Sequence, residues 1–383
     1  MMAAPSSYWF EAIPDQERFP SLEGNLRVDA IVIGGGIAGV SAAYFLSQAG
    51  VSVALLEMGN LVTGDSGYTT AFATPFLDSV PASLAAWPAS EAGIALLKEV
   101  AGRERIDCDW RDVDGIAFTR KEDTGDFRKD FETFAAVDPA MEYLQGAAAS
   151  ALVGFPVRAA FRKKGGEGQF HIRKFLISLA GAAAKAGAQF FERSEVTNIE
   201  RGSEITLTTP KGSVSAKWLV VAAGPPNQFF PTVAGKLSGA ITYVLHAAFS
   251  GVKPFGPSLF WDDLEPYHYF RWVNDSELIL GGEDWVMKEK RPASNPHVAL
   301  EAWLREVSGG AEFVVKNKWQ GTIFYSPDVL PYMGPHPEYG EQVVFLTGWA
   351  GNGMAHGFLA GSIAADLVQR KQNAHQNIFS FTR

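Results

Sequence analysis

Cysteine is almost absent from the 383-residue chain, in which Cys108 is the only one. A single thiol excludes an intrachain disulfide, a Cys-x-x-Cys redox pair and a thiolate metal cluster. The seven histidines are scattered without the spacing of metal ligands, so we predict no metal site. This cysteine usage favours a reducing, cytoplasmic setting.

Long apolar runs and basic stretches are also missing. No hydrophobic segment is long enough to cross a bilayer without a glycine or polar interruption, so we expect no membrane span. Residues 1–20 are polar and acidic, and no secretory signal is visible in them. The formal net charge of −9 argues against nucleic acid as a partner, because a phosphate backbone calls for a basic protein face.

What the chain does contain is a glycine cluster between a predicted strand and a predicted helix. Residues 28–33 form a short β-branched apolar run, typical of a strand buried on both faces, and residues 37–48 form an Ala-rich helical segment. The G-x-G-x-x-G pattern is formed by Gly34 and Gly36, which lie between the two segments, and by Gly39, which lies in the helical segment. In that pattern the first glycine permits a tight turn, the second lets the backbone approach a pyrophosphate, and the third lets the helix pack closely on the strand.

A second apolar run, residues 51–56, ends in Glu57, which lies 18 residues (57 − 39) after Gly39. An acid at the end of this strand is the group that binds the adenosine ribose hydroxyls in dinucleotide sites. A lone G-x-G-x-x-G is weak evidence, but its place between strand and helix, with an acid to follow, indicates a dinucleotide site. The alternative is a structural glycine turn in another α/β fold.

The length of the chain predicts two domains, since one core rarely extends to 383 residues. The pattern departs from alternating strand and helix near residue 81, where we place the start of the second domain. Residues 88–102 and 126–146 are predicted helices, and residues 161–168 (FRKKGGEG) a solvated turn. Residues 213–221 predict a strand of the first domain that runs into the small residues 222–224, and residues 343–369 predict a strand, a glycine-rich turn and a long helix.

Four residues are candidates for a role in substrate binding or catalysis. Period-two alternation places Tyr267, Tyr269 and Arg271 on one face of a strand. This face either forms the wall of a substrate pocket or belongs to a half-buried sheet, in which the tyrosines are part of the core and the arginine pairs with an acid. His356 follows the glycine-rich turn and either faces a cofactor or caps the helix. At the end of the same hairpin, Glu283 and Asp284 could bind a cationic substrate, but a solvated hairpin end is the preferred interpretation.

Four separated motifs then agree with one family: the glycine fingerprint ending in Glu57, the SGYTT loop (66–70), the VVAAGP strand (220–225) and the TGWAGNGMAHG turn (347–357). In this order the chain resembles the D-amino-acid oxidase-like family of FAD-dependent oxidoreductases. That family includes glycine and sarcosine oxidases, D-amino-acid dehydrogenases and oxidases of polyamine derivatives. The resemblance covers nearly the whole chain.

The resemblance implies an α/β protein with an α+β second domain. A Rossmann-like FAD-binding domain would be assembled from residues 1–80, 151–230 and 335–383, and a mixed β-sheet substrate domain from residues 81–150 and 231–334. The implied reaction oxidises a C–N bond of an amine or amino acid by hydride transfer to the flavin, after which the imine is hydrolysed. The electron acceptor would be oxygen or a quinone.

The resemblance also implies a set of cofactor contacts on the motifs quoted above. They are Gly34, Gly36, Ile37, Ala38, Gly39, Glu57, Met58, Ser66, Thr69, Thr70, Val196, Ala223, Gly224, Gly351, Asn352, Gly353 and Met354. The covalent-flavin members carry a cysteine near residues 321–324, and this chain has none there, so we expect non-covalent FAD.

One position departs from the family. Amino-acid-oxidising members carry an arginine that binds the substrate carboxylate, and the matching position here is Ile323. Arg271 would have to supply that charge if the substrate is an α-amino acid. Two other functions stay open: a flavoprotein subunit or electron-transfer flavoprotein without its own amine substrate, and a pyridine-nucleotide-dependent reductase. The reductase would need a second glycine fingerprint and usually a dithiol, neither of which is present.

Overall fold

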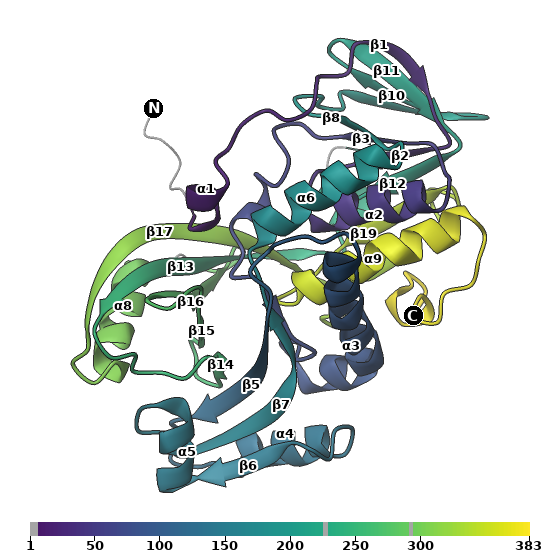
Figure 1. Cartoon of the computed structure of the whole chain (residues 1–383). Helices are drawn as coiled ribbons and strands as arrows, with labels where there is room; N and C mark the ends of the chain where they lie inside the picture. The colour runs from purple at the N-terminus through teal and green to yellow at the C-terminus, as the bar shows by residue number, and fades with distance from the viewer. Residues whose placement is uncertain (1–6, 225–228, 291–293) are drawn as a thin grey trace.

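A mostly parallel sheet of six strands carries the glycine fingerprint (Figure 1). The computed structural model describes residues 7–224, 229–290 and 294–383. The strands, in order across the sheet, are β18 (Tyr332–Pro335), β19 (Val343–Thr347), β12 (Trp218–Val221), β2 (Ala30–Ile33), β3 (Val53–Leu56) and β8 (Gln189–Phe191). Only β18 runs antiparallel to its neighbour. The sheet is therefore built from parts of the chain that lie far apart in sequence.

Helices cover one face of this sheet and a small sheet covers the other. The helices on the first face are α2 (Ile37–Gln48), α6 (Ile172–Lys185) and α9 (Gly353–Val368), and α3 (Val80–Arg103) packs against α9. The small sheet consists of β1 (Gly24–Arg27), β11 (Gly212–Ala216), β10 (Ile205–Thr209) and β9 (Asn198–Arg201). The strands are buried on both faces, which explains their continuous apolar sequences.

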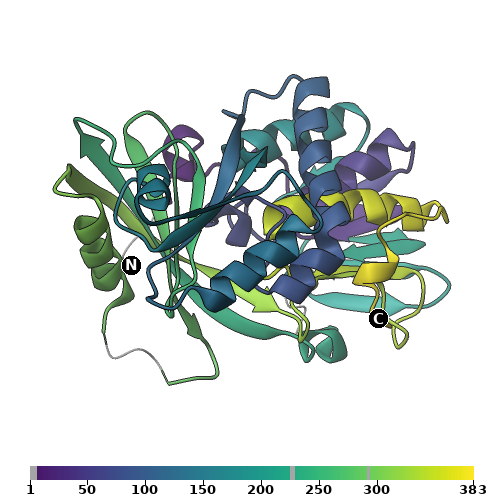
Figure 2. The ribbon, with the colours of Figure 1, turned by 90° about the horizontal axis from the view of Figure 1, so that it is seen from below.

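The second strand system is a mixed nine-stranded sheet, which lies beside the helix-covered sheet (Figure 2). Its main path is β17 (Glu312–Tyr325), β13 (Ser238–Ser250), β16 (Glu277–Val286), β15 (His268–Trp272), β14 (Leu259–Asp262), β5 (Arg111–Thr119), β7 (Ala159–Gln169) and β4 (Phe72–Ala73), and β6 (Glu142–Gln145) pairs with β7. The remaining helices are α1 (Trp9–Ala12), α4 (Gly125–Ala135), α5 (Gly146–Val153), α7 (Pro231–Ala234) and α8 (Pro296–Val307).

Three local expectations differ from the structure. Residues 161–168 are not a solvated turn but the interior of β7, where Lys163 and Glu167 are buried and a bulge lies opposite Asp114 in β5. Residues 126–146 form helix α4 only as far as Ala135, and the strand β6 follows. The predicted helix 88–102 begins earlier, at Val80, because Ser79 caps it by accepting from the Ala82 N–H.

The sheets also divide the chain at points other than the expected domain boundaries. β7 belongs to the nine-stranded sheet, so the chain returns to the six-stranded side at α6, after the predicted boundary at residue 151. β18 begins at Tyr332, just before the predicted boundary at residue 335. Within the described residues, no helix combines the length and apolar composition that crossing a bilayer requires.

Candidate active site

A cavity of about 1360 Å³ lies between the two strand systems. Its walls come from the glycine turn after β2, the loops after β3 and β12, the turn before α9, and the face of the nine-stranded sheet formed by β13, β15, β16 and β17. Pockets for a single small ligand usually measure roughly 300–1,000 Å³. The cavity therefore has room for a dinucleotide together with a small substrate.

The glycine turn has the geometry that a dinucleotide fingerprint requires. Gly34 has φ +107°, and a Cβ there would lie 2.5 Å from the Ala222 carbonyl oxygen. A Cβ on Gly39 would lie 1.8 Å from the Gly34 carbonyl oxygen, so only glycine allows α2 to start this close to the strand end. The first N–H groups of α2 have no acceptor within the helix, and Ser66 Oγ accepts only that of Ile37, at 3.0 Å. This helix start is suited to a pyrophosphate.

Glu57 stands at the end of β3, and both of its carboxylate oxygens are already engaged. Oε2 accepts the Gly35 N–H at 2.6 Å and Oε1 accepts the Gly59 N–H at 2.7 Å. Burial raises the pKa of Glu57, although these N–H groups lower it in part. Each carboxylate oxygen has a second lone pair, and Glu57 lines the cavity. The carboxylate is thus held in place and can still accept ribose hydroxyls.

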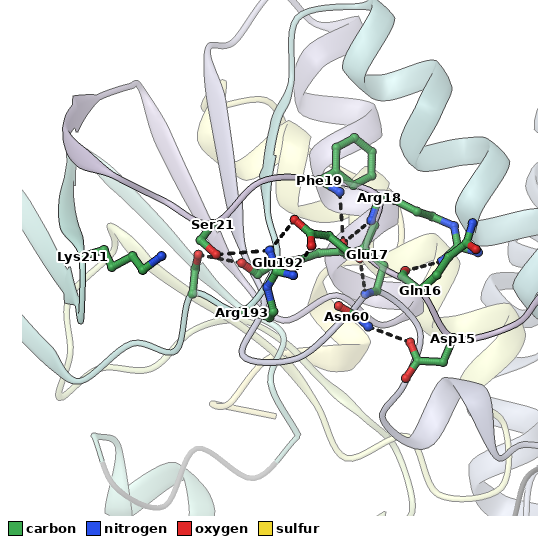
Figure 3. A network of polar contacts seen from close by, with 12 residues as sticks. Asp15, Gln16, Glu17, Arg18, Phe19, Ser21, Asn60, Glu192, Arg193 and Lys211 are labelled. Atoms are coloured by element: carbon green, nitrogen blue, oxygen red, sulfur yellow. Dashed lines mark hydrogen bonds and ion pairs between the residues drawn. The ribbon is translucent and has the colours of Figure 1, made fainter.

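The support behind Glu57 is a network that joins the N-terminal segment to the end of β8 (Figure 3). The buried carboxylate of Glu192 accepts the backbone N–H groups of Arg18 at 2.6 Å and Leu61 at 2.7 Å. The Ser194 N–H donates to the Glu57 carbonyl oxygen at 2.8 Å. These bonds bring the segment after β8, which includes the cavity-lining Val196, next to the acidic end of β3.

The SGYTT loop is held by side chains that donate to its carbonyl groups. Trp319 Nε1 donates to the Tyr68 oxygen at 2.8 Å, and Trp9 Nε1 donates to the Thr69 oxygen at 2.6 Å. Arg271 Nε donates to the carbonyl oxygen of the next residue, Thr70, at 2.8 Å. The loop therefore presents Ser66, Thr69 and Thr70 to the cavity from a fixed backbone.

The turn before α9 closes another part of the cavity wall. The Gly351 N–H donates to Asp78 Oδ2 at 2.9 Å, and a Cβ at Gly351 would lie 2.6 Å from the other oxygen of that carboxylate. Asn352 is buried, and its Nδ2 donates to the Thr74 carbonyl oxygen at 2.8 Å. The start of α9 therefore faces the cavity through Gly351, Gly353 and Met354, while the Asn352 side chain points into the protein.

Tyrosine, threonine and aspartate form the wall that the nine-stranded sheet contributes. The Tyr267 hydroxyl donates to Asp284 Oδ2 at 2.8 Å, and the hydroxyls of Tyr269 and Thr242 are 2.8 Å apart. The two tyrosine rings stack with centroids 5.6 Å apart. Gly281, which pairs with Tyr269, makes room for this arrangement, because a Cβ there would lie 2.4 Å from the ring.

Burial sets the protonation of this wall. It raises the pKa of Tyr267 and of Tyr269, so both hydroxyls stay protonated at neutral pH. Burial also raises the pKa of Asp284 to about 6, against the lowering effect of Thr242 and Tyr267. The wall therefore offers neutral hydroxyls and one carboxylate that is ionised at neutral pH.

Most of the residues that the sequence nominated for the cofactor line this one cavity. They are Gly34, Gly36, Ile37, Ala38, Glu57, Met58, Ser66, Thr69, Thr70, Val196, Ala223, Gly224, Gly351, Gly353 and Met354. Gly39 and Asn352 do not line it and act in the packing behind it. Tyr267 and Tyr269 line it as pocket walls, and so does Ile323.

The side chains of Arg271 and His356 do not face the cavity, as a role in substrate binding would require. Arg271 is 2 % exposed, does not line the cavity, and donates to backbone carbonyls that include those of Thr70 and Phe170. Burial lowers the pKa of Arg271 to about 9, and no acid is paired with it among the described residues. His356 is fully buried between α9 and α3, where Nε2 lies 2.8 Å from Ser90 Oγ. Neither side chain is placed to touch a ligand in the cavity.

Several cavity-lining residues were not nominated from the sequence. Asp78 and Thr242 belong to no recognisable sequence motif. Asp78 lies in the segment before α3 and Thr242 in β13, and the pattern of a single strand cannot show that these two segments meet at the cavity. Asp284 had a signal, its acidic position on the hairpin that carries the two tyrosines. Its neighbour Glu283 has φ +55° and lies within β16, where the register with β13 is irregular.

Comparison with known proteins assigns this chain to a family of FAD-dependent oxidoreductases. A family model described as "DAO: FAD dependent oxidoreductase" matches residues 29–367. Glycine oxidase of Geobacillus kaustophilus is 27 % identical, over 93 % of this chain and 97 % of the relative. Gamma-glutamylputrescine oxidoreductase of Escherichia coli is 22 % identical, over 95 % of this chain and 89 % of the relative. A crystal structure of glycine oxidase from Geobacillus kaustophilus superposes with a TM-score of 0.80 at 23 % identity, covering 94 % of this chain and 99 % of that one.

Proposed function

The chain belongs to the DAO family of FAD-dependent oxidoreductases, and from this premise we propose how its cavity oxidises the C–N bond of an amine or amino acid. The enzyme class and the cofactor follow from the family. The relatives named above act on an amino acid and on a polyamine derivative, as their names state. The observation that carries the proposal is the single cavity that joins the glycine turn to the tyrosine wall.

The residues present fit the adenosine half of FAD. Glu57 would accept the ribose hydroxyls, and the N–H groups at the start of α2 would bind the pyrophosphate. The segment at Val196 would hold the adenine, and the turn at Gly351 would hold the pyrimidine edge of the flavin, where the start of α9 would stabilise negative charge. No cysteine lies in the described lining of the cavity, which supports non-covalent binding.

When bound, FAD accepts a hydride from the carbon next to the amine nitrogen, and this supplies the oxidation. The substrate loses two electrons and that hydrogen, and its nitrogen lone pair forms the C=N bond. Water then adds to the imine carbon and ammonia or a smaller amine leaves, so that a carbonyl compound is the product. The nitrogen must react as the free amine, and no strong base is needed in the site.

The protein's own part is to position the substrate and exclude water. Tyr267 and Tyr269 form a wall beside the reacting carbon and donate hydrogen bonds without losing their protons. The aromatic side chains of Phe76 and Trp261 line the same cavity and add apolar surface to it. Oxygen or a quinone is the electron acceptor in this proposal, and the buried Cys108 as the only thiol supports a reducing, cytoplasmic setting.

Anaerobic mixing of the FAD-loaded protein with a panel of amines and amino acids tests the function. We expect at least one compound to bleach the flavin band near 450 nm, roughly the usual position for a bound flavin. Admission of air or a quinone should restore the band and identify the acceptor. If no compound bleaches a fully loaded flavin, the protein is a flavoprotein without an amine substrate of its own.

A further inference from the structure

Acidic side chains dominate the cavity on the side of the nine-stranded sheet. Among the described lining residues the only base is Lys290, and the lining contains no described arginine or histidine. The acids on this side are Asp78, Asp130, Asp262, Asp263, Glu265, Asp284 and Glu289. A cavity lined in this way attracts cations and repels carboxylates.

Two of these acids already have partners outside the cavity. Asp262 Oδ2 lies 2.9 Å from His268 Nδ1, and Asp263 Oδ2 lies 3.1 Å from Lys121 Nζ. Asp284 has no ion-pair partner among the described residues, although it faces the same cavity. Its charge is therefore available to a ligand.

The two oxygens of Asp284 differ in how they are engaged. Oδ2 accepts the Tyr267 hydroxyl at 2.8 Å, whereas Oδ1 is buried and accepts no hydrogen bond of ordinary geometry from a described residue, because the nearby Thr242 hydroxyl, which lowers the pKa of this carboxyl, lies 2.8 Å from the Tyr269 hydroxyl. A buried carboxylate oxygen without a donor is costly unless a ligand supplies one. A protonated nitrogen supplies both the N–H donor and the opposite charge.

A substrate carboxylate would find no arginine among the described residues that line the cavity. Ile323 lines it where amino-acid-oxidising relatives are expected to carry an arginine, and the Arg271 guanidinium is turned away to the Thr70 carbonyl. The charge of Asp78 instead raises the pKa of Asp284. An α-carboxylate there would add a further like charge.

We propose that the substrate is an amine that carries a second, protonated nitrogen and no α-carboxylate, and that Asp284 is the specificity-determining residue that binds this second nitrogen. This inference rests on the proposed function. The two nitrogens then have different states: the one next to the oxidised carbon reacts as the free amine, and the distal one stays charged against Asp284. The tyrosine wall and the apolar side chains fill the space between them.

The test compares 1,4-diaminobutane with 1-aminobutane, which has the same carbon chain and one charge, and with glycine. Anaerobic reduction of the FAD-loaded protein gives kcat/KM for each. We expect the diamine to exceed the monoamine by roughly tenfold or more, and Asp284→Asn to bring this ratio close to unity. Asn keeps the shape and can still accept from Tyr267. Glu289→Gln, which removes an equal charge from an exposed lining residue, should leave the ratio unchanged.

Binding of butylguanidinium, a cation without a primary amine to oxidise, gives a second readout by calorimetry. We expect its Kd to rise by roughly tenfold in Asp284→Asn and to stay constant in Glu289→Gln. A ratio that survives Asp284→Asn, or faster reduction by glycine than by either amine, overturns the inference and leaves the proposed function in place. Binding that depends on Asp284 without reduction by any compound overturns the proposed function, and with it the claim that the bound cation is a substrate, but keeps Asp284 as the residue that binds the cation.

Discussion

Arg271 Nε donates to the Thr70 carbonyl oxygen at 2.8 Å, and through this bond a side chain of β15 fixes the loop beside the cavity. The guanidinium is buried and pairs with carbonyl groups instead of an acid. Trp9 and Trp319 donate to the two preceding carbonyl groups of the loop. Arg271 thus acts as a positioning residue for the loop that carries Ser66, Thr69 and Thr70.

Replacing Arg271 should therefore weaken cofactor binding without changing substrate preference. In Arg271→Met the Thr70 carbonyl group of the loop loses its hydrogen bond from the guanidinium. We therefore expect the Kd for FAD to rise by roughly tenfold. The ratio of kcat/KM for amines to that for amino acids should stay at the wild-type value, because the guanidinium does not line the cavity. Flavin fluorescence titration gives the Kd. A selective loss of activity on substrates with a carboxylate would show instead that Arg271 binds them.

Gly281→Ala should damage the substrate wall and spare the cofactor site. The new Cβ would lie 2.4 Å from the rigid Tyr269 ring, so the ring must move and lose its contact with Thr242. We expect kcat/KM to fall by roughly tenfold or more, with the Kd for FAD unchanged. Gly102→Ala is the matched control, since nothing lies within 4 Å of a Cβ there. Wild-type kcat/KM in Gly281→Ala would contradict the role of this wall.

His356 predicts a pH dependence of stability. Burial lowers its pKa to about 3 in the folded protein, against an ordinary value near 6.5. Between these values the unfolded chain binds a proton that the folded chain does not, so the free energy of unfolding falls as pH falls from about 6.5 towards 3. Relative to His356→Gln, which does not titrate, the wild type should lose on the order of 3 kcal/mol between pH 7 and pH 4.

Denaturant unfolding of both proteins at several pH values measures this difference. The flavin spectrum and the pH dependence of kcat should be the same in His356→Gln as in the wild type, because His356 contacts Ser90 and not the cavity. A variant that changes the spectrum would place His356 against the cofactor after all.

The family and the fold class were predictable from the sequence, and the family match confirms both. The reason is local: Gly34, Gly39 and Glu57 work within one strand–helix–strand unit, and each has a geometric task that few other residues can fill. The periodicity of residues 267–271 likewise placed Tyr267 and Tyr269 on the cavity.

Other features depend on contacts between distant segments, and no local pattern carries them. The alternation correctly places Arg271 on the same face of the strand as the two tyrosines. Arg271 is two residues beyond Tyr269, however, and its side chain donates to the Thr70 carbonyl oxygen instead of lining the cavity. Residues 161–168 looked like a solvated turn because their charges are visible, whereas their burial depends on β5. Asp78 lines the cavity and accepts the N–H of Gly351, which lies far along the chain.

Titration of the flavin-free protein with FAD tests the central claim most directly, namely that a dinucleotide lies across the glycine turn with its ribose on Glu57. We predict saturation at equimolar FAD, a Kd that rises by roughly tenfold in Glu57→Gln, and an unchanged Kd in Glu195→Gln, an exposed acid on the same part of the cavity. A wild-type protein that takes up no flavin, or a Glu57→Gln variant that binds FAD as tightly as the wild type, would contradict the account.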